Sequence, residues 1–204
     1  MDKLVQKLTN MITDPLQYDG EQRAVVQYGL FAIVQIISIG LIITLVGILA
    51  DCVWECWIVY IAAGLLRKST GGAHAKTPNA CFVVSIITVS IIALISHYIL
   101  LLTYALPVSI ILSVFAFLLG CFIIYKLAPV GHPNKPLNKP EKIKRLRKQS
   151  FITLLIYVAI FVIFLVLSFK LDRSMALLVS LSLSVLWQAF TLVKSAGNSV
   201  GGCS

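Results

Sequence analysis

The sequence predicts an all-α polytopic protein that crosses a membrane about six times. Hydrophobic residues make up 59% of its 204 residues, charged residues only 12%, and the mean hydropathy is +0.95. A soluble domain of this size needs more charge than that to cover its surface. The chain also contains uncharged runs that are each long enough for one or more helical spans of about 20 residues, at 24–50, 77–125, 149–169 and 174–193. A chain of this length has room for a single membrane domain, which we assign to residues 1–204.

The breaks in these runs give the expected positions of the spans. Asp51 and Glu55 mark a turn at the far surface, which leaves a short second span, and residues 104–107 divide the longest run. Residues 170–173 join the last two spans. We therefore expect spans at residues 24–49, 52–66, 80–103, 107–125, 149–169 and 174–193.

The N-terminal segment, residues 1–23, is mixed in charge and does not have the pattern of a signal peptide. Apolar side chains at Leu4, Leu8, Met11 and Ile12 fall on one helical face, with most of the polar residues elsewhere. This pattern favours an amphipathic helix that lies on the membrane surface and ends at the following proline. The alternative interpretation is a polar N-terminal segment that does not bind the membrane surface.

Lysine and arginine residues indicate the orientation of the spans. With both termini in the cytoplasm, all 17 basic residues except Lys170 and Arg173 lie on the cytoplasmic side. The net charge of +9 comes mainly from a central loop at 126–148. Retention of this loop on the cytoplasmic side and attraction to anionic lipid would explain its charge. An acidic peptide could also dock there, whereas a nucleic-acid role is not expected, because the loop lacks interleaved aromatic residues.

The segment at 67–80 is a small-residue break in the apolar chain, and Cys81 follows it directly. Thr77 is a good helix N-cap, and Pro78 suits the first helical position, so a helix is expected to begin here. Cys81 would then lie in the first turn of that helix. Because the N-terminus of a helix favours an anion, the thiolate form of Cys81 should be stabilised.

A histidine seven positions before this cysteine completes the candidate site. His74 precedes the cap closely enough to fold back onto the sulfur, and Gly71 and Gly72 permit the tight backbone path that this needs. A thiol and an imidazole that can take its proton are the minimum for cysteine nucleophilic catalysis. A zinc site is a poorer fit, because the segment offers two ligands where four are usual.

Other residues of this segment have weaker candidate roles. Arg67 could bind a substrate carboxylate, hold the loop, or simply extend its charged end to the membrane surface. The amides of the glycine pair could contribute to an oxyanion hole. Lys76 adds positive potential, and Asn79 is close in sequence to the histidine, although no third residue that orients His74 can be named.

The remaining cysteines and histidines are expected to have structural roles or none. Cys52 and Cys56 lie four apart and would share one helical face, as packing residues or as an exposed thiol pair. Cys121 and His97 fall within expected spans and are interpreted as packing residues of the bundle. Cys203 belongs to the tail, and His132 could be structural or functional.

The segment RKSTGGAHAKTPNAC at 67–81 resembles the signature of the AgrB family, the accessory gene regulator B peptidases of Gram-positive quorum sensing. A second segment, APVGHPNKPL at 128–137, resembles the motif of that family after the fourth span. Chain length, number of spans and the basic central loop also agree. The shared signature is an arginine, two glycines, His-Ala and a cysteine seven residues after the histidine, which are here Arg67, Gly71, Gly72, His74, Ala75 and Cys81.

The resemblance implies a membrane-embedded cysteine endopeptidase that removes the acidic C-terminal tail of an AgrD-type precursor peptide. Cys81 would be the nucleophile and His74 the general base, and the acyl-enzyme thioester would support closure of a thiolactone or lactone ring in a cyclic autoinducing peptide. The resemblance also implies the cell membrane of a Gram-positive bacterium, an active site on the cytoplasmic side and a homodimer. No cofactor and no metal are expected.

Two other classes of protein compete with this interpretation. Six spans and few charges would suit a peptide exporter, although charges that mark an ion pathway are largely missing if Asp51 and Glu55 sit at a turn. A non-catalytic membrane scaffold would leave His74 and Cys81 without a chemical role. Rhomboid and metalloprotease mechanisms are disfavoured, because the chain has neither a Gly-x-Ser-Gly nor a His-Glu-x-x-His motif.

Overall fold

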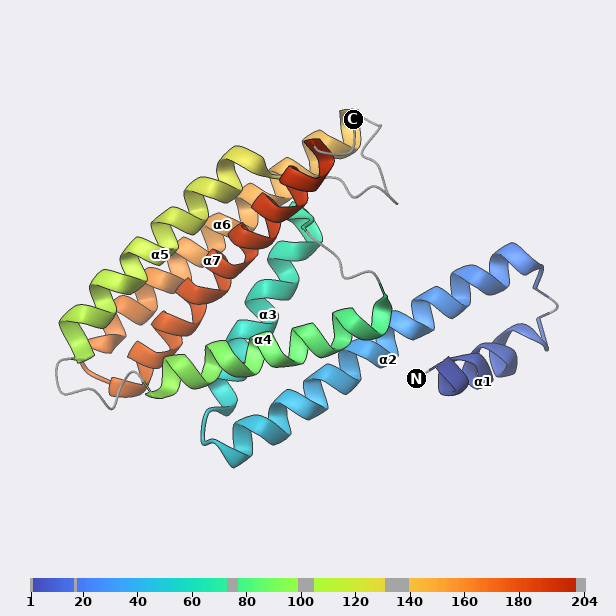
Figure 1. Ribbon diagram of the computed structural model, residues 1–204, viewed down its shortest axis with the longest axis horizontal. Coiled ribbons are helices and arrows are strands. Elements are labelled where there is room, and N and C mark those ends of the chain that lie inside the picture. The colour runs from blue at the N-terminus through green and yellow to red at the C-terminus, as the bar shows by residue number, and fades with distance from the viewer. Residues whose placement is uncertain (1, 17, 73–76, 99–104, 131–139, 201–204) are drawn as a thin grey trace.

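The computed structural model describes residues 2–16, 18–72, 77–98, 105–130 and 140–200, and all of its regular elements in these ranges are helices (Figure 1). They are α1 (Asp2–Thr13), α2 (Gly20–Leu49), α3 (Val53–Thr70), α4 (Pro78–Tyr98), α5 (Ala105–Leu127), α6 (Pro140–Ser168) and α7 (Asp172–Val200). Five of them, α2, α4, α5, α6 and α7, are long and apolar enough to cross a membrane. The predicted all-α membrane fold is therefore confirmed.

The short second span predicted at 52–66 corresponds to α3, which is not one of these five helices. It has 18 residues, among them Glu55, Arg67 and Lys68. At 1.5 Å per residue it measures about 27 Å, a little less than the hydrocarbon core of about 30 Å. A count of six spans and the cytoplasmic location of both termini accordingly remain predictions.

Two predicted loops prove to be partly helical. Helix α6 begins at Pro140, so the second half of the basic segment 126–148 forms its first turns. Helix α3 continues to Thr70, four residues past the expected end of the second span, whereas α4 begins at Pro78, as the Thr77-Pro78 pair predicts. Charged residues make these stretches look like loops, but Lys, Arg and Glu are good helix formers, and a helix can continue past the membrane surface.

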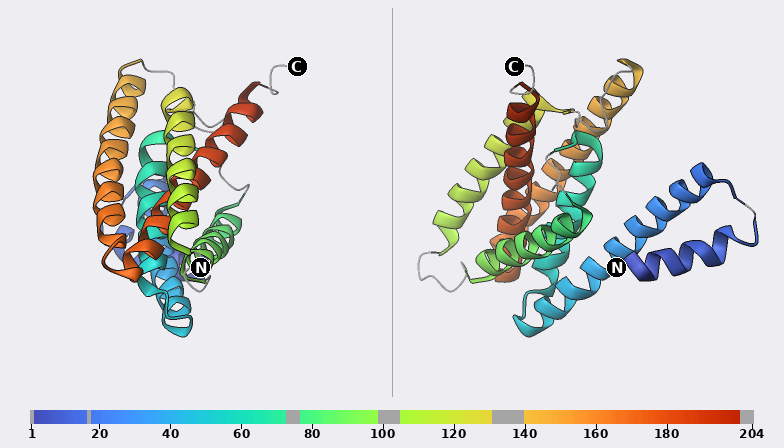
Figure 2. Two further views of the ribbon diagram at one scale, coloured as in Figure 1. Left: turned by 90° about the vertical axis from the view of Figure 1, so that its left-hand side faces the viewer. Right: turned by 45° about the vertical axis from the view of Figure 1, so that its right-hand side comes forward.

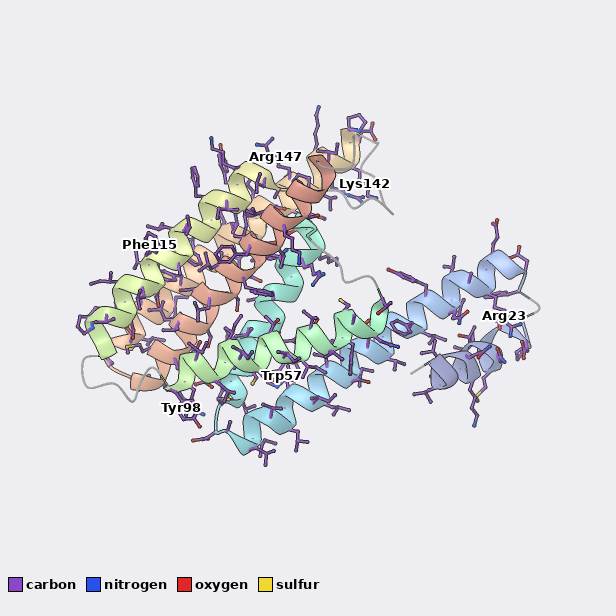
Figure 3. All side chains as sticks on the ribbon, viewed as in Figure 1. Arg23, Trp57, Tyr98, Phe115, Lys142 and Arg147 are labelled. Atoms are coloured by element: carbon purple, nitrogen blue, oxygen red, sulfur yellow. The ribbon has the colours of Figure 1, made fainter. Side chains whose placement is uncertain are left out.

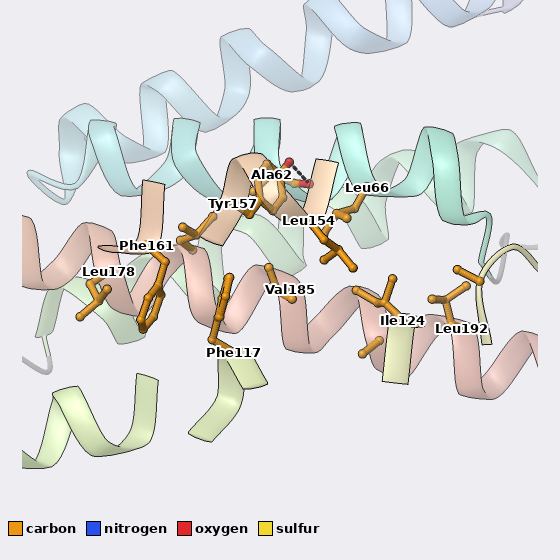
Figure 4. Packing of buried hydrophobic residues seen from close by; sticks show 13 residues of the cluster. Ala62, Leu66, Phe117, Ile124, Leu154, Tyr157, Phe161, Leu178, Val185 and Leu192 are labelled. Atoms are coloured by element: carbon orange, nitrogen blue, oxygen red, sulfur yellow. Dashed lines mark hydrogen bonds between the residues drawn. The ribbon is translucent and has the colours of Figure 1, made fainter. Parts of the chain in front are cut away.

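Helix α7 lies at the centre of the larger hydrophobic core, where it packs against α3, α5 and α6. Figure 4 shows side chains of these helices meeting along α7. The rings of Phe117 on α5 and Phe161 on α6 stack with their centroids 4.4 Å apart. The hydroxyl of Tyr157 on α6 donates a hydrogen bond to the carbonyl oxygen of Ala62 on α3 at 2.9 Å. These contacts fix α3 against the bundle of α5, α6 and α7.

Gly120 permits a particularly close approach of α5 to α7. A Cβ at this position would lie 2.9 Å from Cγ1 of Val185 and 3.1 Å from the backbone nitrogen of Leu186. Small residues are enriched at such contacts in membrane proteins, because they let two helix backbones approach. The glycine is thus required by packing against α7.

A smaller core joins the other face of α3 to α2 and α4, and it contains a buried carboxylate. Cys52 and Cys56 are fully buried there, with their sulfur atoms 4.0 Å apart, which agrees with packing residues and not with an exposed thiol pair. The prediction that Glu55 marks an exposed turn is wrong. Glu55 is only 1% exposed, and its Oε1 lies 3.5 Å from Nδ1 of His97 on α4. Asp51 is exposed at the turn, as predicted.

Helix α1 folds back along the first part of α2 (Figure 2). Its residues Val5, Thr9 and Thr13 are buried, whereas Leu4 and Met11 remain exposed. Arg23 at the start of α2 lies 3.6 Å from the carboxylate of Asp14. The predicted helix is present, and its uncovered apolar side chains fit the predicted contact with a membrane surface.

Two features of the arrangement position the candidate site. Figure 1 and the right-hand view of Figure 2 show α4 crossing α3 steeply, so that the start of α4 diverges from the end of α3. Figure 3 shows Lys142 and Arg147, on the first turns of α6, at the end of the bundle where α3 finishes, whereas Tyr98 lies at the opposite end. The end of α3 and the basic start of α6 thus share one end of the molecule.

Candidate functional site

Cys81 lies in the first turn of α4, where a side-chain cap fixes the beginning of the helix. The backbone N–H of Ala80 donates to Oγ1 of Thr77 at 3.2 Å, and the N–H of Cys81 donates to the carbonyl oxygen of Thr77 at 3.1 Å. The predicted cap at Thr77 is therefore confirmed. The thiol of Cys81 therefore lies beside the positive end of the α4 helix dipole.

The environment of Cys81 differs from that of the other cysteines in the described part of the chain. Its side chain is half-buried and belongs to neither hydrophobic core. In contrast, Cys52 and Cys56 are buried in the smaller core, and Cys121 packs against the larger one. Of these four thiols, Cys81 combines partial exposure with a helix N-terminus, which is the environment of a reactive cysteine.

The glycine pair marks the point where the chain leaves α3. Gly71 has a φ of 78° and Gly72 a φ of 136°, a backbone region that other residues rarely adopt. A Cβ at Gly71 would overlap the carbonyl oxygen of Val130, and a Cβ at Gly72 would lie 2.9 Å from Oγ1 of Thr191 on α7. Both glycines are thus required by conformation and by close packing, as their predicted structural role demands.

Three segments that are distant in sequence meet at this glycine pair, and we call their meeting point the junction: residues 70–72, residues 128–130 and Gln188. The backbone N–H of Val130 donates to the carbonyl oxygen of Thr70 at 3.0 Å. Nε2 of Gln188 on α7 donates to Oγ1 of Thr70 at 2.9 Å and to the carbonyl oxygen of Gly71 at 2.7 Å. The end of α3 is thereby fastened both to α7 and to the segment that follows α5.

Sequence reasoning missed Gln188, although a signal for it was present. The residue is 2% exposed and stands within the uncharged run 174–193. An amide in an apolar helix is costly to bury unless it finds hydrogen-bond partners. A lone glutamine in an apolar span could therefore have been singled out, but its partners, more than a hundred positions earlier, could not.

A small pocket opens between α3, α4 and α7, below the start of α4. Its volume is about 100 Å³, and Arg67 contributes to its lining. Cys81, Val84, Ser85 and Thr88 share one face of α4, because residues three, four and seven positions apart are neighbours on a helix. The hydroxyl of Ser85 donates to the carbonyl oxygen of Cys81 at 2.8 Å. The pocket, which Val84, Ser85 and Thr88 line, thus begins one helical turn from the thiol.

A wider and shallower depression lies on the N-terminal hairpin, lined by Gln6, Lys7, Asn10, Met11, Asp14 and Pro15. None of the candidate residues contributes to it. We therefore place the candidate site at the pocket between α3, α4 and α7, together with the junction above it.

The predicted site residues fall into three groups. Arg67, Gly71 and Gly72 gather at the end of α3, near Gln188. Cys81 and the exposed Asn79 lie in the first turn of α4. His74 and Lys76 lie outside the described residues, as do His132, Cys203 and the proline-rich segment at 131–139. The approach of His74 to Cys81 therefore stays a prediction.

The sequence matches the family model described as AgrB, accessory gene regulator B, over residues 3–192. It is 32% identical over 196 residues to an AgrB-like protein of Clostridium perfringens strain 13, and 29% identical over 194 residues to one of strain SM101, with 94% of this chain and 91% of each relative covered. An AgrB-like protein of Clostridium acetobutylicum is 26% identical over 160 residues, which is 78% of this chain and 73% of that protein. No solved structure matches the chain. Because the family model covers nearly the whole sequence, the chain belongs to the accessory gene regulator B (AgrB) family.

Proposed function

We propose that the chain is a membrane-embedded cysteine endopeptidase that removes the C-terminal tail of an AgrD-type precursor peptide and supports ring closure of the product. Membership of the AgrB family places the chain in accessory gene regulator quorum sensing and suggests a precursor peptide as its partner. The single observation that carries the enzymatic proposal is the position and partial burial of Cys81. It is a half-buried thiol in the first turn of a capped helix.

The first half of the proposed reaction is cleavage. His74 takes the proton from Sγ of Cys81. The thiolate attacks the carbonyl carbon of the peptide bond that links the C-terminal tail to the preceding part of the precursor, which we call the signal segment. The tetrahedral intermediate collapses when its C–N bond breaks, and His74 gives the proton to the departing amine of the tail. The signal segment remains on Cys81 as a thioester.

The second half is ring closure. A cysteine thiol or serine hydroxyl of the precursor attacks the thioester carbonyl, its proton passes through His74 to Sγ of Cys81, and the acyl group moves to the new sulfur or oxygen. With a thiol, one thioester replaces another, so this exchange is nearly isoenergetic. Restricted access of water favours ring closure over hydrolysis.

The other candidate residues have supporting roles in this proposal. Arg67 lines the pocket and holds either a carboxylate of the substrate or the loop itself. Gly71 and Gly72 set the path of the chain, and their amides are candidates for stabilising the oxyanion. Lys76 and Asn79 would contribute positive potential and a polar contact near the thiol. We further propose that the chain acts as a homodimer in a Gram-positive cell membrane containing anionic lipids, with this site on the cytoplasmic side.

The decisive experiment uses liposomes that contain the full chain and a tagged precursor peptide. The precursor is best found as a short open reading frame beside the gene. Cys81→Ser and His74→Ala should abolish release of the tail, and mass spectrometry of the wild-type protein should find a thioester at Cys81. Cys121→Ser is the matched control, because this half-buried cysteine lies on α5 away from the site. Normal cleavage by both site variants would refute the proposal.

One observation favours a peptide exporter as the second candidate. Glu55 is almost completely buried and lies beside His97, and ionisable residues within a membrane domain often mark a transport pathway. Transport of a peptide by a Cys81→Ala variant at the wild-type rate would support this candidate. Loss of tail release in that variant supports the enzyme.

A further inference from the structure

The pocket next to Cys81 has the size of one side chain. Its volume of about 100 Å³ is smaller than the roughly 150 Å³ of an apolar cavity that takes up benzene. Val59, Val84, Val89 and Trp187 provide apolar walls, and small residues on α3, among them Gly64, leave the space open. The lining also contains polar side chains, those of Arg67, Ser85, Thr88 and Gln188. The pocket therefore fits an aliphatic side chain better than an aromatic ring.

The pocket has a defined base and a defined direction. At its base, the hydroxyl of Tyr60 donates to the carbonyl oxygen of Ile36 on α2 at 3.2 Å, which holds the ring in place. Its lining on α4 begins with Val84 and Ser85, one helical turn after Cys81. One turn of an α-helix advances about 5.4 Å, roughly the distance from a reacting carbonyl carbon to the far part of its own side chain.

We propose that this pocket receives the side chain of the substrate residue whose carbonyl group Cys81 attacks, and that it selects an aliphatic residue at that position of the precursor. The inference rests on the proposed function and adds to it the chemical class of the residue that precedes the cleaved bond. One extra or missing methylene group in a hydrophobic pocket typically changes kcat/KM by roughly 10- to 200-fold. Selection of this size is readily measured.

Gly64 gives a direct way to fill the pocket. It lines the pocket, and a Cβ added at this position would meet no other atom within 4 Å. Gly64→Ala and Gly64→Leu therefore occupy progressively more of the pocket without a clash at Cβ, and both replace glycine by a better helix former. A Cβ added at Gly29 on α2 would likewise meet nothing within 4 Å, and Gly29→Leu is the matched control away from the pocket.

The test compares these variants in liposomes with precursor peptides that carry Ala, Val, Leu, Phe or Asp at the position before the cleaved bond. The wild type should cleave the Val or Leu peptide at least about tenfold better than the Ala and Phe peptides. A preference for the Asp peptide would assign the pocket, which Arg67 also lines, to a carboxylate and would overturn the inference. Gly64→Leu should reverse the preference between Leu and Ala, and Gly64→Ala should give an intermediate ratio. Gly29→Leu should keep the wild-type ratio. An unchanged ratio in Gly64→Leu, with a wild type that cleaves, would overturn the pocket inference and leave the proposed function intact.

A second readout does not depend on turnover. A photoreactive leucine analogue at the same peptide position should crosslink, in the Cys81→Ala protein, to residues 59–67 or 84–89, and Gly64→Leu should abolish that crosslink. Crosslinking outside α3, α4 and α7 would overturn the inference. Cleavage of the peptide panel by Cys81→Ala itself would instead refute the proposed function.

Discussion

Gln188 offers a direct test of the idea that the junction positions the segment 67–80 for catalysis. We consider Gln188→Met, which keeps the length and approximate volume of the side chain but removes its amide. The change deletes the donations to Oγ1 of Thr70 and to the carbonyl oxygen of Gly71. Gln188 also lines the pocket, and because the volume is retained, the pocket should keep its size. The substitution thus removes the amide and its hydrogen bonds without filling or enlarging the pocket.

The structure gives the magnitude of the effect. The hydroxyl of Thr70 has one proton, and its donation to the carbonyl oxygen of Leu66 at 2.8 Å is shorter than that to Gly71 at 3.3 Å. The Gly71 carbonyl is therefore left without a good donor, which costs about 1 to 3 kcal/mol, and loss of the bond to Thr70 costs about 1 kcal/mol more. A tenfold change in rate corresponds to about 1.4 kcal/mol, so a total cost of about 2 to 4 kcal/mol that falls on the transition state should lower kcat by roughly 30-fold to several hundredfold while KM changes little.

The assay is tail release from the precursor in liposomes, combined with thermal unfolding of the purified protein. Gln149→Met is the matched control, because it makes the same chemical change at an exposed position of α6. It should leave both kcat and the unfolding temperature as in the wild type. A wild-type kcat in Gln188→Met would refute the argument that these hydrogen bonds position the loop, even if the unfolding temperature fell.

Two further predictions concern stability. His97→Leu removes the side chain whose Nδ1 lies 3.5 Å from the buried carboxyl group of Glu55 and should lower the free energy of unfolding by about 1 to 3 kcal/mol, the cost of a buried polar group that loses its partner. The double variant Glu55→Leu/His97→Leu should recover most of the lost stability, as measured by thermal unfolding in detergent. A double variant whose loss of stability equals the sum of the losses in the two single variants would contradict this expectation. Gly120→Val should overlap Val185 and lower the free energy of unfolding by about 1 to 3 kcal/mol or more, with Gly29→Val as the unaffected control. Equal unfolding temperatures for these two glycine variants would show that α5 and α7 can separate without cost.

The sequence predicts those parts of the fold that depend on neighbouring residues. Uncharged runs locate the helices, and the Thr77-Pro78 pair places the start of α4 correctly, because a cap is formed by residues within one turn. The glycine pair was expected to permit a tight backbone path, and both glycines have a positive φ, although α3 continues to Thr70 and not only to residue 66. These signals are local, so they can be interpreted without knowledge of the tertiary structure.

The parts that were missed depend on partners far away in the chain. Glu55 looks like a turn residue until α4 brings His97 to it, and Gln188 has no visible function until α7 meets the end of α3. The helical start of α6 was missed because hydropathy identifies only the apolar stretch that spans the membrane. It does not show how far the helix continues into the polar residues before that stretch. The approach of His74 to Cys81 remains a prediction from spacing and from the family signature.

The length of α2 has a consequence for the membrane in which the protein works. Its 30 residues measure about 45 Å, roughly 15 Å more than the hydrocarbon core, whereas α3 is about as long as the core itself. Helices of such different lengths cannot all match one bilayer without tilting or projecting from it. A thicker or thinner membrane would therefore change the tilt of α2 relative to α3. The length of the lipid chains would thereby act on the angle between α2 and α3, and α3 is one of the helices that line the pocket.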